Sequence, residues 1–195
     1  MLGKEEIILE LYDRGIIQFG DFVLSSGKHS SFYINLRILP SFPRLFKDIV
    51  KLFIDKCLAG LEFDVVCGVA TGGIPFAAYI SFFLNKPLAY VRKERKSHGL
   101  KDLVVGIVDG KKILVVDDVA TTGGSLIQAI EHLKRSNGII MHAGVLVLRS
   151  NKPLNALSKL NVKLAYLLTG REILKTLLER GKICEDTYNK AIREV

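Results

Sequence analysis

The chain has 195 residues, of which 49% are hydrophobic and 25% are charged, the balance of an ordinary globular domain with a sizeable core. Its formal net charge of +8 favours an anionic partner, either a nucleic acid or a polyphosphate substrate. The sequence contains no apolar run near the ~20 residues of a membrane span, no zinc-ligand pattern and no aromatic RNA-binding motif. We therefore expect neither a membrane nor a nucleic acid as a partner.

The first 60 residues predict two helices with a pair of strands between them. Apolar residues at helical spacing predict one helix over residues 4–14 and another over residues 43–57. Residues 19–24 and 32–36 alternate in polarity as strands do, and the turn-rich residues 25–30 separate them. The expected order is therefore helix, strand, strand and helix.

Beyond residue 60, short apolar strands alternate with helices. The predicted strands are residues 65–69, 87–91, 103–107, 113–116, 139–148 and 162–168. The predicted helices are residues 75–84, 126–134, 171–180 and 185–193. This alternation predicts an α/β fold with a doubly wound, mainly parallel sheet flanked by helices, formed by a single domain over residues 1–195. In such sheets ligands bind beyond the carboxyl ends of the strands.

The stretch of residues 113–125 carries the strongest chemical signal. Four apolar residues predict a strand, Asp117 and Asp118 follow at its carboxyl end, and a turn rich in Thr and Gly then opens a helix. The backbone N–H groups of such a turn lie at the positive end of the helix dipole and can cradle a phosphate. The two carboxylates would repel a phosphate, and they suit sugar hydroxyls or a divalent cation instead.

This stretch resembles the phosphoribosyl diphosphate (PRPP) binding motif of the type I phosphoribosyltransferases. The resemblance implies PRPP contacts from Asp117, Asp118, Val119, Ala120, Thr121, Thr122, Gly123, Gly124 and Ser125. A second small-residue turn, which holds Thr71 and Gly72 here, contacts the pyrophosphate in that family. The alternatives are a structural strand–turn–helix with an acidic N-cap for the first stretch and an ordinary tight turn for the second.

A basic run occupies residues 92–101, directly after a predicted strand. It holds five cations and one acid, together with His98. A solvated loop is the default interpretation of such a run, but its place at the expected site favours a lid. In a lid, Lys96 and His98 would stabilise negative charge on a diphosphate leaving group and exclude water.

Three features resemble the orotate phosphoribosyltransferases more narrowly. They are the Arg-Lys-x-x-Lys-x-His-Gly pattern that starts at Arg92, residues 19–37, which match that family's hood segment, and Arg149 at the end of a predicted strand. The resemblance implies a small hood of about residues 1–40 and a core of about residues 60–170. An isolated arginine at a strand end is otherwise more often a salt-bridge partner.

The same resemblance implies the roles of individual residues. Those implied to bind orotate are Tyr33, Ile34, Thr121 and Arg149, whose guanidinium suits a planar carboxylate. Those implied to bind the diphosphate are Arg92, Lys93, Lys96 and His98. The implied catalytic residues are Lys96, His98, Asp117 and Asp118. In this family part of the lid reaches into the neighbouring subunit's site, which implies a homodimer.

The implied reaction joins orotate to PRPP and gives orotidine 5′-monophosphate and pyrophosphate, a step of UMP biosynthesis. Mg²⁺ is the implied cofactor and is held mainly by PRPP, without a metal site built from protein side chains. Two positions depart from the family, because Ser25 and Gly72 stand where lysines are frequent. Arg95 and Lys101 are candidates to compensate for those two lysines.

Two other functions share the central motif. Another type I phosphoribosyltransferase would act on adenine, hypoxanthine-guanine or uracil, but these bases lack a carboxylate for Arg149 to bind. A PRPP-sensing regulator that binds nucleic acid would fit the net charge of +8 and would bind DNA or RNA in a salt-sensitive manner. A lid with Lys96 and His98 argues against a regulator, since a sensor needs no group that stabilises a leaving group.

The three cysteines, Cys57, Cys67 and Cys184, are odd in number and show no CxxC spacing. They indicate reduced thiols in a cytoplasmic protein. The first ten residues are charged and lack the apolar core of a signal peptide. Cys67 lies in an apolar run, so we expect a small core residue there and not a nucleophile.

Overall fold

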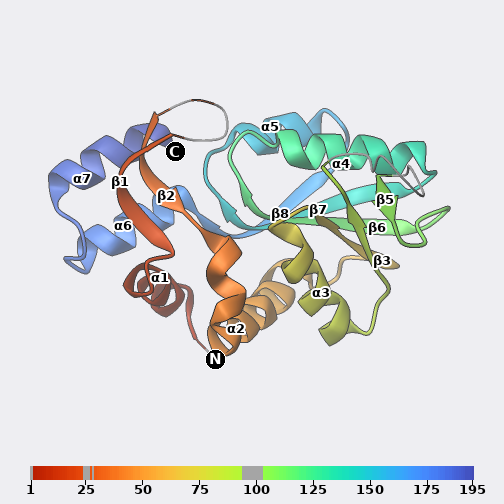
Figure 1. The fold of residues 1–195 in the computed structure, drawn as a ribbon, viewed down its shortest axis with the longest axis horizontal. Helices are drawn as coiled ribbons and strands as arrows, with labels where there is room; N and C mark the ends of the chain where they lie inside the picture. The colour runs from red at the N-terminus through yellow and green to blue at the C-terminus, as the bar shows by residue number, and fades with distance from the viewer. Residues whose placement is uncertain (1, 24–26, 28, 94–102) are drawn as a thin grey trace.

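A six-stranded sheet forms the centre of the molecule (Figure 1). The computed structural model describes residues 2–23, 27, 29–93 and 103–195. In space the strands follow the order β5-β4-β3-β6-β7-β8. Their bounds are Val104–Val105 for β5, Leu88–Val91 for β4, Val65–Val69 for β3, Lys112–Ala120 for β6, Ile139–Leu148 for β7 and Lys163–Thr169 for β8. Only β5 runs antiparallel to its neighbour among these strands, so the predicted doubly wound, mainly parallel sheet is confirmed.

The central strand β6 is longer than the sequence predicted. The prediction ended it at residue 116, with both carboxylates beyond the strand. The ladder between β6 and β7 instead continues through Asp117, which pairs with Val145, to Ala120, which pairs with Leu148. The apolar, ten-residue β7 offers backbone partners along this whole length, so the change to polar side chains does not end the strand.

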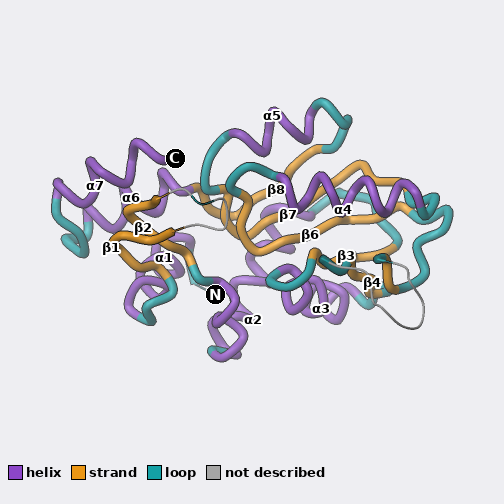
Figure 2. The backbone as a smooth tube through the Cα atoms, turned by 45° about the horizontal axis from the view of Figure 1, so that its top comes forward, coloured by secondary structure: helices purple, strands orange, loops and turns teal. Residues whose placement is uncertain are grey.

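Two layers of helices cover the sheet (Figure 2). Helices α2 (Pro43–Phe53) and α3 (Gly73–Leu84) lie on one face, and α4 (Gly124–Arg135) and α5 (Lys152–Ser158) lie on the other. Successive side chains of β6 point to opposite faces, as strand geometry requires. Leu114 and Val116 therefore join the core with α2 and α3, whereas Ile113 and Val115 join the core with α4.

The segment expected as the hood lies to one side of the sheet, beside elements from the other end of the sequence (Figure 1). An antiparallel pair, β1 (Ile17–Val23) and β2 (His29–Ile34), packs with α1, which spans Lys4–Asp13. Three later elements pack beside them: α6 (Gly170–Glu179), α7 (Glu185–Ala191) and the 3-10 helix η3 (Ile192–Glu194). The hydroxyl of Tyr12 donates to the carbonyl of Lys182 at 3.0 Å, which joins the two groups.

The remaining differences from the prediction concern element ends and elements that the sequence did not predict. The predicted helix over residues 43–57 is α2 followed by a π-helical turn at Ile54–Leu58. A 3-10 helix at Leu36–Ser41 and the short helix α5 were not predicted. Helix α3 begins two residues before the predicted start. Within the residues that the structure describes, no helix has both the length and the apolarity to cross a membrane.

Candidate active site

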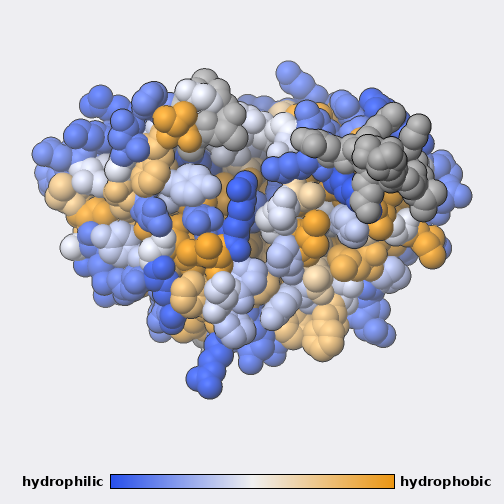
Figure 3. Space-filling view, viewed as in Figure 1, coloured by the Kyte–Doolittle hydropathy of each residue, from blue (hydrophilic) through white to orange (hydrophobic). Residues whose placement is uncertain are grey.

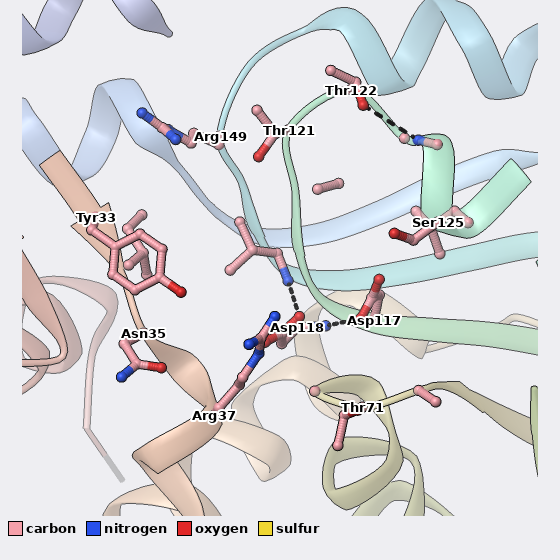
Figure 4. A pocket seen from close by; sticks show the side chains of 18 of the residues that line it. Tyr33, Asn35, Arg37, Thr71, Asp117, Asp118, Thr121, Thr122, Ser125 and Arg149 are labelled. Carbon is pink, nitrogen blue, oxygen red and sulfur yellow. Dashed lines mark hydrogen bonds between the residues drawn. The ribbon is translucent and has the colours of Figure 1, made fainter. Parts of the chain in front are cut away.

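A cavity of about 530 Å³ opens at the carboxyl ends of β3, β6 and β7, where the hood faces the sheet. Figure 4 shows Tyr33 and Arg149 on one side of the cavity and Ser125 on the other, with Asp117 and Asp118 between them. The predicted site residues that line it are Tyr33, Ile34, Thr71, Gly72, Lys93, Asp117, Asp118, Val119, Ala120, Thr121, Thr122, Gly123, Gly124, Ser125 and Arg149.

The turn between β6 and α4 presents backbone N–H groups to the cavity. Gly123 precedes α4 with φ of 85°, a left-handed conformation that glycine adopts without steric cost. The first N–H groups of α4, from Gly124 onward, have no acceptor inside the helix. The N–H of Gly124 has Oγ1 of Thr122 at 3.5 Å, and an anion of phosphate size fits this combination of N–H donors and helix dipole.

Two adjacent carboxylates form the floor of the cavity. Asp117 is only 8% exposed, and its Oδ1 accepts the N–H of Asp118 at 2.9 Å. Burial, together with the neighbouring charge of Asp118, raises the pKa of Asp117 well above its usual value, and the charge of Lys93 opposes this rise. The Oδ1 of Asp118 accepts the N–H of Val119 at 2.9 Å, which fixes the second carboxylate.

The turn at Thr71 and Gly72 lines the same cavity. The peptide bond between Ala70 and Thr71 is cis. A Cβ atom at Gly72 would collide with the carboxylate of Asp118. Gly72 thus leaves the space that Asp118 fills.

Arg149 is buried, with 5% of its surface exposed. Its Nη2 lies 2.5 Å from Oγ of Ser30 and 2.8 Å from Oε2 of Glu194. Its guanidinium carbon lies 4.3 Å from the centroid of the Phe32 ring. Within the described part of the chain, its buried Nε has no hydrogen-bond partner. A buried donor without a partner costs free energy.

The cationic residues predicted to bind the diphosphate differ in their position relative to the cavity. Lys93 lines the cavity, whereas the guanidinium carbon of Arg92 lies 6.0 Å from the centroid of the Tyr90 ring. Other predicted residues lie outside the described part of the chain, namely Ser25, Arg95, Lys96, His98 and Lys101.

Sequence reasoning missed several residues that line the cavity: Phe22, Val23, Asn35, Arg37, Ala70 and Leu126. Arg37 is the most important because it adds a cation, and Figure 4 shows its side chain extending toward Asp118. It belongs to the segment that resembles the hood, but its approach to the floor depends on the 3-10 helix at Leu36–Ser41. No local pattern signals that helix.

Comparisons with known proteins agree with this geometry. A family model described as the phosphoribosyl transferase domain matches residues 38–167. An orotate phosphoribosyltransferase of Sulfolobus acidocaldarius is 40% identical over 93% of this chain and 91% of its own length. One of Staphylothermus marinus is 43% identical over 94% of this chain and 90% of its own length.

This chain belongs to the orotate phosphoribosyltransferase family. The crystal structure of the orotate phosphoribosyltransferase from Aeropyrum pernix superimposes with a TM-score of 0.78 and 37% identity, covering 88% of this chain and 97% of that one. Membership of the orotate phosphoribosyltransferases confirms the resemblance inferred from the central motif, the lid pattern and Arg149. It supports neither a purine or uracil transferase nor a regulator that binds nucleic acid.

Proposed function

We propose that this cavity transfers the 5-phosphoribosyl group from PRPP to orotate, which gives orotidine 5′-monophosphate and pyrophosphate for UMP biosynthesis. One observation carries the proposal. A turn suited to a phosphate, a carboxylate pair and a buried arginine line a single cavity. A sugar that bears phosphates at both ends and a flat base with a carboxylate would match all three.

The 5′-phosphate binds the turn of residues 119–125 through main-chain N–H groups. Asp117 and Asp118 orient the ribose hydroxyls and stabilise the positive charge that develops as the bond from C1 to the diphosphate breaks. Positive charge that enters this pocket favours ionised Asp117, just as the charge of Lys93 does. Catalysis then arises from positioning and charge placement, without a covalent enzyme nucleophile.

The diphosphate binds beside the turn that holds Thr71 and Gly72. Arg92, Lys93 and Arg37 supply positive charge from described residues, and Arg37 and Lys93 line the cavity. Lys96 and His98 complete this set from the lid, where they stabilise the leaving group.

Orotate occupies the side of the cavity near the hood. The main chain at Tyr33 and Ile34 lines this side, and Thr121 lies opposite. The carboxylate of orotate accepts hydrogen bonds from Arg149, whose planar guanidinium suits a charge-assisted contact. Its ring nitrogen then attacks ribose C1.

Mg²⁺ fits this cavity as an ion that arrives with PRPP. Within the described residues no three His, Cys, Asp or Glu side chains form a metal-binding group. Asp117 and Asp118 would face an ion that PRPP itself mainly holds. When bound, the ion neutralises charge on the diphosphate.

A homodimer is supported by the apolar surface over α3 (Figure 3). Phe82 in α3 is 81% exposed, and large exposed apolar patches frequently mark interfaces. We propose that two copies meet there and that residues of the lid act in the neighbouring site. We place the protein in the cytoplasm, because Cys57, Cys67 and Cys184 are all free thiols.

The test is consumption of orotate with PRPP and Mg²⁺, followed by ultraviolet absorbance, beside a panel of adenine, hypoxanthine, guanine and uracil. We expect turnover with orotate and with none of the other four bases. An Arg149→Gln variant should raise the KM for orotate by about tenfold or more, since a charge-assisted hydrogen bond contributes roughly 1.5–3 kcal/mol. Turnover of uracil or adenine without turnover of orotate would contradict the proposal.

A further inference from the structure

Glu194 contacts Arg149 from the side that faces away from the substrate cavity. Oε2 of Glu194 lies 2.8 Å from Nη2 of Arg149. Arg149 lines the cavity, whereas Glu194 lines a separate groove on the far side, together with Ser30 and Ser31. The ion pair therefore forms part of the wall between the two.

Strand β2 holds the carboxylate of Glu194 in place. The hydroxyl of Ser30 donates to Oε2 at 2.6 Å, and the backbone N–H and the hydroxyl of Ser31 donate to Oε1 at 2.7 and 2.6 Å. Burial opposes the charge of Glu194, but these hydrogen bonds and the charge of Arg149 outweigh it and lower the pKa of Glu194. The carboxylate is thus a fixed anion.

Among the residues that the structure describes, the polar contacts of the Arg149 guanidinium all involve Nη2. Nη2 meets Glu194, Ser30 and the carbonyl of Phe32, while Nε has no partner within the described residues. A planar group held by one nitrogen and by the ring of Phe32 has a fixed plane. The N–H groups of Nη1 then keep a fixed direction, in which one of them can donate to a substrate carboxylate.

The segment that carries Glu194 is itself anchored near Arg149. A Cβ at Gly170 would meet the carbonyl oxygen of Arg149 and the side chain of Val195, both at 2.7 Å. Only glycine permits this close approach. Ala191, just before η3, is fully buried. These contacts tie η3 to the end of β7, from which Arg149 projects.

We propose that Glu194 is a positioning residue for base recognition, which holds Arg149 by Nη2 so that the rest of the guanidinium binds the carboxylate of orotate. This rests on the proposed role of Arg149 in orotate binding. A competing role, in which Glu194 occupies the place of the substrate carboxylate, conflicts with its position outside the cavity and with its three hydrogen bonds to β2.

The test measures the KM for orotate and for PRPP separately in Glu194→Ala and Glu194→Gln. Loss of one charge-assisted hydrogen bond predicts a rise of about tenfold or more in the KM for orotate in Glu194→Ala. The KM for PRPP should change by less than about twofold, because the phosphate-binding turn lies elsewhere. Glu194→Gln keeps one acceptor oxygen, and it should show a smaller rise when that oxygen faces Nη2 of Arg149.

Glu185→Gln serves as the matched control, because it removes one exposed carboxylate from the adjacent α7 and should leave both KM values unchanged. An unchanged or lower KM for orotate in folded Glu194→Ala would overturn the proposal. If Glu194→Ala does not fold, an unchanged or lower KM for orotate in Glu194→Gln would overturn the proposal. A failure of this proposal can be told apart from a failure of the proposed function, because only Arg149→Gln tests whether Arg149 binds orotate.

Discussion

The carboxylate of Asp118 occupies the space that a Cβ atom at residue 72 would need, so that a side chain there would displace it. Asp118 comes from β6 and Gly72 from the turn after β3, the neighbouring strand. The contact therefore couples the proposed ribose-binding carboxylates to the proposed pyrophosphate turn. A relative with a lysine at this turn would need a different position for its second carboxylate.

Gly72→Ala tests this coupling. The added methyl group should rotate the Asp118 side chain out of its hydrogen bond with the N–H of Val119 and lower kcat by about tenfold or more, the effect of one lost hydrogen bond to a charged group. Steady-state kinetics with orotate and PRPP measure it. Gly3→Ala is the control, because a Cβ there meets only an ordinary contact at 3.8 Å. Wild-type kcat in Gly72→Ala would show that Asp118 does not need this space.

The fold was predictable wherever hydrophobic periodicity decides structure. β3 and β7 match the predicted bounds because each is an apolar run between turn residues. The end of β6 was not predictable, since its polar residues stay in the ladder through backbone pairing with β7. Local pattern carries no information about a partner strand.

The residues of the site likewise fall into those that the sequence predicts and those that it does not. The turn after β6 was predictable because its Gly and Thr residues are contiguous and resemble a known motif. Glu194 was not, because its contact with Arg149 spans 45 residues of sequence. Arg37 was missed for a similar reason, as a 3-10 helix brings it to the cavity.

Arg37→Gln should weaken PRPP binding. Its guanidinium is a cation of the cavity wall, and its loss should raise the KM for PRPP about tenfold, as expected for one hydrogen bond between charged groups. The KM for orotate should change little. Lys56→Gln, which removes an exposed cation away from the cavity, is the control. An equal KM for PRPP in both variants would exclude Arg37 from binding the diphosphate.

The three thiols should react in a fixed order with an aromatic disulfide reagent. Cys184 is exposed, and hydrogen bonds from Thr187 lower its pKa, so it should react first. Burial raises the pKa of Cys57, and it raises the pKa of Cys67 to about 12. Cys67 should therefore react only after unfolding. Cys184→Ser should remove the fast phase without changing kcat, and fast labelling of that variant would contradict the order.

Asp117→Asn should stabilise the protein increasingly as pH rises. Because burial and the charge of Asp118 raise the pKa of Asp117 in the folded state, the folded chain keeps a proton that the unfolded chain releases above the ordinary pKa of 3.8. The free energy of unfolding therefore falls with pH between that value and the raised pKa, by about 1.4 kcal/mol for each unit crossed. The asparagine variant does not titrate at residue 117, so its advantage in the free energy of unfolding over the wild type should be small near pH 4 and larger near pH 8.

Urea unfolding without PRPP or Mg²⁺ measures the difference, with the exposed Asp55→Asn as control. An advantage that shrinks as pH rises would show that Asp117 is ionised in the folded state at low pH, and activity should fall in the asparagine variant in either case.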